Sequence, residues 1–118
     1  MKFIVFFVFT LSLLQANDVA FNRGETLFFS KACSSCHGPD AQGTTTYPKL
    51  ANKKESYLIK RLRELRAGKA DTVSAQMMAQ FARKLSDQNI ADLAHFLSHH
   101  PKPKVSDLDD DILGGVGS

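Results

Sequence analysis

The sequence predicts an all-α protein, a small globule of about four helices. Apolar residues recur at helical spacing in several stretches, and turn-forming residues separate these stretches. The alternation of apolar and polar residues that is typical of strands does not extend over any length. The chain has 118 residues, which is enough for one domain.

The first segment differs in composition from the rest. Lys2 precedes an apolar run over residues 3–14, and the small residue Ala16 follows. This pattern is typical of a cleaved signal peptide, and the run is shorter than the roughly 20 residues that span a bilayer. An uncleaved anchor and a buried strand are the alternatives. We therefore expect a signal peptide over residues 1–16, export to the periplasm and no stable membrane insertion after cleavage.

Local signals place the helices of the remaining chain. Asn22 and Glu25 have the spacing of a capping box, Gly68 stands where a left-handed residue ends a helix, and Ser86 is a suitable N-cap. A turn-rich loop is expected over residues 38–48. The expected helices run over residues 23–32, 54–67, 73–84 and 87–98.

Composition and charge indicate the extent of the domain and the kinds of partner it could bind. We expect it to cover residues 17–100, followed by a flexible tail over residues 101–118, which are rich in Pro, Asp and Gly. The formal net charge of +3 is too small to indicate nucleic-acid binding. Basic residues gather between Lys49 and Lys69, where they could dock an acidic partner or form a solvated helix face.

The pentapeptide Cys33-Ser34-Ser35-Cys36-His37 carries the chemistry. Two thiols at this spacing can add to the two vinyl groups of one haem, and the histidine that follows can bind the iron. A thioredoxin-like pair would need a βαβ context, a zinc site would need a distant fourth ligand, and a disulfide would leave His37 without a role. The sequence therefore predicts one haem c, bound covalently through Cys33 and Cys36, at the centre of the globule.

Over about residues 20–98 the chain resembles the class I cytochromes c. It is similar to small bacterial periplasmic members with one haem and to the halves of related two-haem cytochromes. Besides the haem motif, the resemblance rests on Gly24, Phe28, Gly38-Pro39-Asp40, Tyr47-Pro48-Lys49-Leu50-Ala51, Tyr57-Leu58, Arg66-Ala67-Gly68 and Leu85-Ser86-Asp87. The early attachment site argues against the four-helix-bundle cytochromes.

The resemblance implies a methionine as the sixth ligand of the iron, opposite His37. In similar proteins this methionine lies seven residues before the leucine that precedes the final helix, and counting back from Leu85 leads to Met78. The neighbouring Met77 is the alternative, or both methionines could only fill core space. A ligand from His95 would give a bis-histidine haem.

The resemblance also implies two sets of contacts. The carbonyl of Pro48 would accept a hydrogen bond from the ligand imidazole. Gly24 and Phe28 would meet the last helix near Leu93 and Phe96. The remaining histidines, which we expect to be exposed or to satisfy the end of the last helix, are His95, His99 and His100.

An iron with protein ligands on both faces has no open position for a substrate. The resemblance therefore implies an electron carrier and not an enzyme, cycling between Fe(II) and Fe(III). We expect a monomer that exchanges electrons with redox protein partners, a donor and an acceptor, with membrane respiratory complexes among the candidates. A cytochrome subunit of a redox enzyme complex and a five-coordinate haem sensor or peroxidase are the alternatives.

Overall fold

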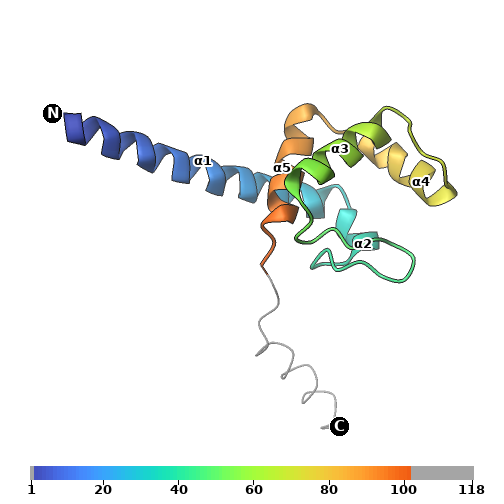
Figure 1. Cartoon of the computed structure of the whole chain (residues 1–118). Coiled ribbons are helices and arrows are strands. Elements are labelled where there is room, and N and C mark those ends of the chain that lie inside the picture. The colour runs from blue at the N-terminus through green and yellow to red at the C-terminus, as the bar shows by residue number, and fades with distance from the viewer. Residues whose placement is uncertain (1, 102–118) are drawn as a thin grey trace, which may run out of the picture.

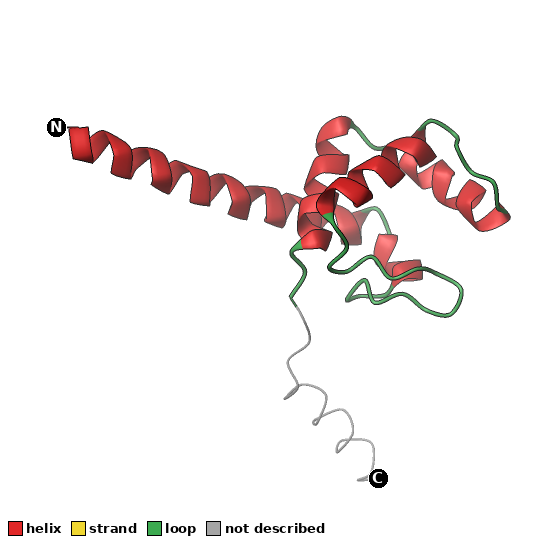
Figure 2. Cartoon of the chain, viewed as in Figure 1, coloured by secondary structure: helices red, strands yellow, loops and turns green. Residues whose placement is uncertain are grey.

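The computed structural model describes residues 2–101, with side chains from residue 15 onward. Over this range the chain forms five helices and no strand (Figure 2). The helices are α1 (Lys2–Ser30), α2 (Cys33–His37), α3 (Glu55–Arg66), α4 (Val73–Ala82) and α5 (Asp87–Ser98). The all-α prediction is confirmed, and the short helix α2 is the element that it did not include.

Helices α1 and α5 cross at the centre of the molecule (Figure 1). Phe28 of α1 is fully buried there, and its ring centroid lies 5.6 Å from that of Phe96 of α5. Gly24 faces the same helix so closely that a Cβ atom on it would lie 2.6 Å from the Phe96 Cβ and would overlap the Asp92 carbonyl. The expected contact of Gly24 and Phe28 with the last helix is therefore confirmed.

The apolar core has two parts. The larger part joins α1, α3 and α5 and includes Leu58, Ile90 and Leu97, all of them buried. The smaller part joins α3 and α4 through Leu65 and Ala79, together with Ala82. Helix α4 thus packs on α3 at the edge of the globule, and its inner side faces the space between the two parts.

The first helix begins earlier than expected. Asn22 lies inside α1, where its carbonyl accepts a hydrogen bond from the Thr26 hydroxyl at 3.0 Å, so the prediction of an N-cap at Asn22 is wrong for this chain. Neither proline nor glycine interrupts the preceding residues, and Phe21 packs against Phe96 with ring centroids 5.1 Å apart. The helix also continues through Ala16 without a break.

The ends of the later helices follow local signals. Ser86 caps α5 through its side chain, and Asn89 completes a capping box with it. Gly68 has a φ of 85°, the left-handed conformation expected after α3. Thr72, which the sequence analysis did not single out, caps α4 by accepting a hydrogen bond from the Ala75 N–H at 3.1 Å. Helix α4 ends at Ala82, two residues before the predicted end.

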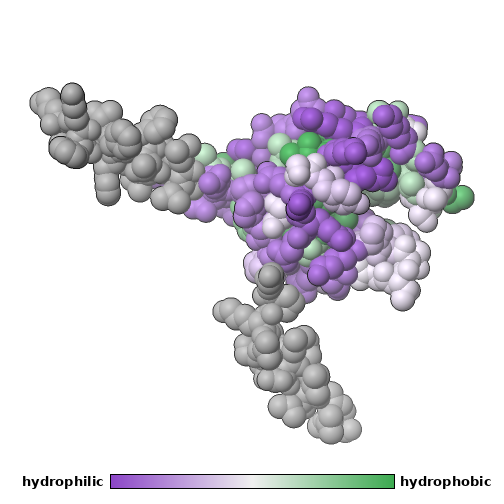
Figure 3. All heavy atoms as spheres, in the orientation of Figure 1, coloured by the Kyte–Doolittle hydropathy of each residue, from purple (hydrophilic) through white to green (hydrophobic). Residues whose placement is uncertain are grey.

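Hydrophilic side chains cover most of the face shown in Figure 3, and hydrophobic ones gather in small areas between the helices. Among residues 2–101, no helix combines the length and the apolar character needed to cross a membrane. The predicted tail, apart from Pro101, lies outside the described residues.

Candidate functional site

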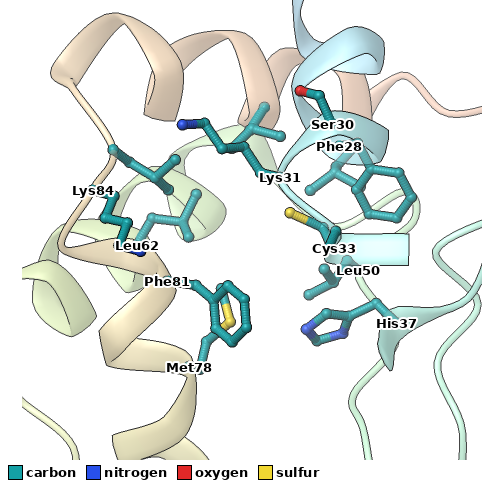
Figure 4. Close-up of a pocket in the computed structure, with 14 residues that line it drawn as sticks. Phe28, Ser30, Lys31, Cys33, His37, Leu50, Leu62, Met78, Phe81 and Lys84 are labelled. Carbon is teal, nitrogen blue, oxygen red and sulfur yellow. The ribbon is translucent and has the colours of Figure 1, made fainter. Parts of the chain in front are cut away.

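A cavity of about 290 Å³ lies between α1, α2, α4 and α5, with one wall from α3 and the loop after α2. Most of the side chains around it are apolar, as the close-up in Figure 4 shows. The lining residues are Phe28, Ser30, Lys31, Ala32, Cys33, His37, Leu50, Leu62, Met78, Phe81, Lys84, Leu85, Leu93 and Leu97. A flat apolar group could be held here away from water.

The two cysteines lie on the short helix α2. The chain changes direction between α1 and α2 at Ala32, which has a left-handed φ of 61°. Cys33 then projects into the cavity (Figure 4), and burial raises the pKa of its thiol. Cys36 is partly buried one turn later and is not among the residues that line the cavity. The two cysteines are not joined in a disulfide.

His37 is the last residue of α2 and is only 7% exposed. Its Nδ1 lies 2.8 Å from the carbonyl oxygen of Pro48, which confirms the expected contact. Because a carbonyl can only accept, Nδ1 carries the hydrogen and Nε2 keeps its lone pair. The imidazole is thus oriented as a metal-binding histidine requires.

The loop between α2 and α3 holds Pro48 in place. The Gly43 N–H donates to the His37 carbonyl at 2.8 Å, and Gly43 has a left-handed φ of 71°. A Cβ atom at Gly43 would lie 2.6 Å from the Tyr47 carbonyl oxygen and 2.6 Å from the Lys49 nitrogen. Only glycine allows the two arms of the loop to approach this closely, and the approach brings the Pro48 carbonyl within hydrogen-bond distance of His37 Nδ1.

The two adjacent methionines have different surroundings. Met78 is partly buried and lines the cavity from α4, whereas His37 enters from α2 on the other side (Figure 4). Met77 is 56% exposed and is not among the lining residues. The fold therefore brings Met78, and not Met77, to the same cavity as Cys33 and His37.

The other histidines lie elsewhere on the molecule. His95 is on α5, but its Nδ1 is 3.7 Å from Glu55 of α3, and it does not belong to the cavity lining given above. His99 follows α5 and is exposed. The arrangement gives the bis-histidine alternative no support.

Three polar residues of the lining were not predicted. Ser30 and Lys31 come from the end of α1, and Lys84 comes from the turn after α4. No motif or spacing in the sequence marks them, because lysines are common on any surface. Only the tertiary fold, which packs α1 on α5 and α4 on α3, brings the two lysine side chains to one cavity.

The residues around the cavity fit a covalently bound haem. Two free thiols stand three residues apart, and a buried imidazole with a free Nε2 follows them. A thioether sulfur lies on the opposing helix, and the surrounding walls are apolar. These are the donor types of c-type haem attachment and ligation.

Comparison with known proteins decides the family. The sequence model of the cytochrome c family matches residues 21–101, which include the haem motif and every wall of the cavity. The chain belongs to the cytochrome c family. It is a class I member by its helical fold and its early attachment motif, and this family implies a covalently bound haem c and a part in electron transfer.

Several bacterial cytochromes c are similar to the chain. Cytochrome c4 of Azotobacter vinelandii is 32% identical over 105 residues, which cover 83% of this chain and 48% of that protein. Cytochrome c4 of Pseudomonas aeruginosa is 30% identical, with coverage of 82% and 47%. Cytochrome c-554(548) of Halomonas halodenitrificans is 37% identical over 67 residues, which cover 56% of this chain and 81% of that protein. The chain therefore spans about half the length of the cytochromes c4 that it matches.

Proposed function

We propose that the protein is a periplasmic electron carrier with one haem c, attached through Cys33 and Cys36 and ligated axially by His37 and Met78. The observation that carries the proposal is the cavity that Cys33, His37 and Met78 line together. The protein would be a carrier and not an enzyme, because two protein ligands leave no open coordination position for a substrate. The domain would cover residues 17–100.

The bound haem would supply a one-electron Fe(II)/Fe(III) couple. Pro48 orients the His37 ring through the hydrogen bond from Nδ1, so the ring would keep one orientation in both oxidation states. The aromatic and aliphatic walls, with Phe28, Leu93 and Leu97 among them, would cover apolar surface of the haem. A fixed ligand and apolar walls would keep the structural change between the two states small.

The Met78 side chain would raise the reduction potential of the haem iron relative to a second histidine ligand. A thioether is a soft and neutral ligand, which favours the ferrous state relative to a second imidazole. Helix α4 positions this side chain because Ala79 and Ala82 pack on α3 through the smaller part of the core. The methionine is therefore attached to a rigid element and not to a loop.

Electrons would be exchanged with a protein donor and a protein acceptor. Val73, Met77 and Phe81 expose much of their apolar surface on α4, and Phe81 also lines the cavity. Exposed apolar side chains beside a redox site are typical of a surface on which a protein partner docks transiently. In the nearby basic segment, Lys60 and Arg61 contact Glu64, so part of that charge is already paired within α3.

Periplasmic location is supported by the N-terminal sequence. Lys2, the apolar run that follows and Ala16 have the order of a signal peptide. Haem c is attached outside the bacterial cytoplasm, so the predicted export is consistent with the haem-attachment motif. N-terminal sequencing of the mature protein tests this point, with Asn17 expected as the first residue.

The ligation is tested by visible and near-infrared spectra of the oxidised and reduced protein. We expect a weak far-red sulfur-to-iron band in the wild type, lost in Met78→Ala and retained in Met77→Ala. Met77→Ala is a matched control because it removes the same side chain one position away, on the exposed side of α4. Absence of the band in the wild type, together with rapid binding of carbon monoxide by the reduced protein, would contradict the proposal.

A further inference from the structure

Away from the cavity, three side chains that can bind metal ions meet at the ends of two helices. Glu55 is the first residue of α3, His95 lies in the last turn of α5, and His99 is the residue that follows this helix. One potential ligand atom from each residue lies within 4.8 Å of those from the other two. We call these three residues the Glu55 cluster.

The spacing in the Glu55 cluster is close to that of a metal site. His95 and His99 stand four residues apart at the end of α5, and their ring centroids are 4.4 Å apart. The Nδ1 of His95 is 3.7 Å from Oε1 of Glu55. Two ligand atoms of a tetrahedral zinc ion, each about 2.0–2.1 Å from the metal, are separated by about 3.3 Å. Small side-chain rotations would therefore bring the three ligands to one ion.

The hydrogen bonds of His99 provide independent support. Its Nδ1 lies 2.9 Å from the carbonyl oxygen of His95 and 3.0 Å from the Ser98 hydroxyl. A carbonyl only accepts, so Nδ1 carries the hydrogen and Nε2 keeps a free lone pair. A ring nitrogen that donates to a backbone carbonyl while the other stays free is the usual arrangement of a metal-bound histidine.

The electrostatic surroundings favour a cation. The C-terminal end of α5 carries the partial negative charge of its unpaired carbonyl groups, and His99 lies at that end. Glu55 adds a full negative charge, which outweighs the partial positive charge at the start of α3. The His95 side chain is 18% exposed and that of Glu55 is 41% exposed, so an ion can reach ligands that are already partly shielded from water.

We propose that Glu55, His95 and His99 bind a divalent first-row transition metal ion, in a site separate from the haem. Imidazole and carboxylate ligands together suit Zn²⁺, Cu²⁺ or Ni²⁺. Three protein ligands leave a position for water. Bound there, the ion connects the start of α3 to the end of α5, which are far apart in the sequence, and it stabilises the folded chain.

The test uses Zn²⁺ as the probe and the haem-loaded protein, in which the cysteine sulfurs are no longer free thiols. Isothermal titration near neutral pH, after treatment with a chelator, should show one saturable site. We expect His99→Ala to weaken Zn²⁺ binding by about tenfold or more and Glu55→Gln to weaken it severalfold. Zn²⁺ at a hundred times its Kd should raise the Tm of the wild type by at least about 5 °C.

His100→Ala is the matched control. His100 is the next residue, but its ring packs on Phe96 and its Nδ1 contacts the Pro101 carbonyl, so it lies outside the cluster. Its replacement should change the Kd by less than about twofold. The proposal is overturned if the wild type binds no Zn²⁺ saturably, or if His100→Ala weakens binding as much as His99→Ala. Helical circular dichroism and the haem spectrum of each variant check folding. If His99→Ala is misfolded, Glu55→Gln, at a partly exposed side chain, tests the site instead.

Discussion

At the scale of single residues, the buried carboxylate of Asp92 on α5 was not foreseen from the sequence. Its Oδ2 accepts a hydrogen bond from Arg23 Nε at 2.9 Å, and its Oδ1 accepts from Arg23 Nη2 at 3.1 Å and from Gln88 Nε2 at 2.9 Å. The side chain of Asp92 is 3% exposed. The hydrogen bond from Arg23 is the main reason why the pKa of Asp92 is lowered. The carboxylate is therefore held in its charged form between α1 and α5.

This pair makes the stability of the protein depend on pH. Because the folded pKa of Asp92 is below the unfolded value of about 3.9, its contribution is present above that pH and is lost as the pH falls through the folded pKa. We expect Asp92→Asn to lower the Tm at neutral pH, and the difference from the wild type to shrink at pH values below about 4. Thermal unfolding followed by circular dichroism across this range measures it, with the exposed Asp40→Asn as the control. A difference that stays constant with pH would refute the assignment.

At the scale of elements, the crossing of α1 and α5 depends on Gly24. An alanine inside a helix normally stabilises it by about 1 kcal/mol relative to glycine. Here the added Cβ would overlap the Asp92 carbonyl and press on Phe96, so the helices would have to separate. We expect Gly24→Ala to lower the free energy of unfolding by about 1–3 kcal/mol, as overpacking of a core does. Urea unfolding measures the change, and an increase in stability would show that the crossing is looser than described.

The start of α5 offers a second test at this scale. The Ser86 hydroxyl accepts a hydrogen bond from the Asn89 N–H at 3.0 Å, and the Asn89 side chain accepts from the Ser86 N–H at 3.1 Å. We expect Ser86→Ala to lower the free energy of unfolding by about 1 kcal/mol. Thr72→Ala at the start of α4 is the comparison, since Thr72 makes one such bond without the reciprocal one. Equal losses in the two variants would mean that the reciprocal bond adds nothing.

At the scale of the whole molecule, the cavity interrupts the core of a small domain. A chain of this size buries a limited share of its surface, so we expect it to depend on a group that fills the cavity. The double variant Cys33→Ala/Cys36→Ala should carry no haem on a denaturing gel, and its Tm should be lower by at least about 10 °C. The control is Ser34→Ala/Ser35→Ala, which alters the same helical turn and leaves both thiols. Covalent haem in the cysteine variant, or an unchanged Tm, would contradict the proposed attachment.

How much could be predicted depends on where the signals lie in the chain. The bounds of α5 match the prediction because Ser86 and the residues around it carry the capping signal locally. The predicted start of α1 was wrong because the capping pattern of Asn22 and Glu25 lies inside a longer helix, whose preceding residues include no proline or glycine. The contact between Pro48 and His37 was predicted only by resemblance, since no local signal shows that the loop folds back to bring the Pro48 carbonyl to His37 Nδ1.

The sequence by itself determined the chemistry of the protein. Two cysteines and a histidine occur in this order within five residues. The sequence alone sets this spacing, and it predicts haem attachment without reference to the fold. The periodicity of the apolar residues likewise determined a helical class. The tertiary structure decided which distant residues come together: Arg23 contacts Asp92, Lys31 and Lys84 line one cavity, and Glu55 lies near His95 and His99. The physical reason is that these residues are far apart in the chain, and only the packing of α1 and α3 on α5, with α4 on α3, sets their distances.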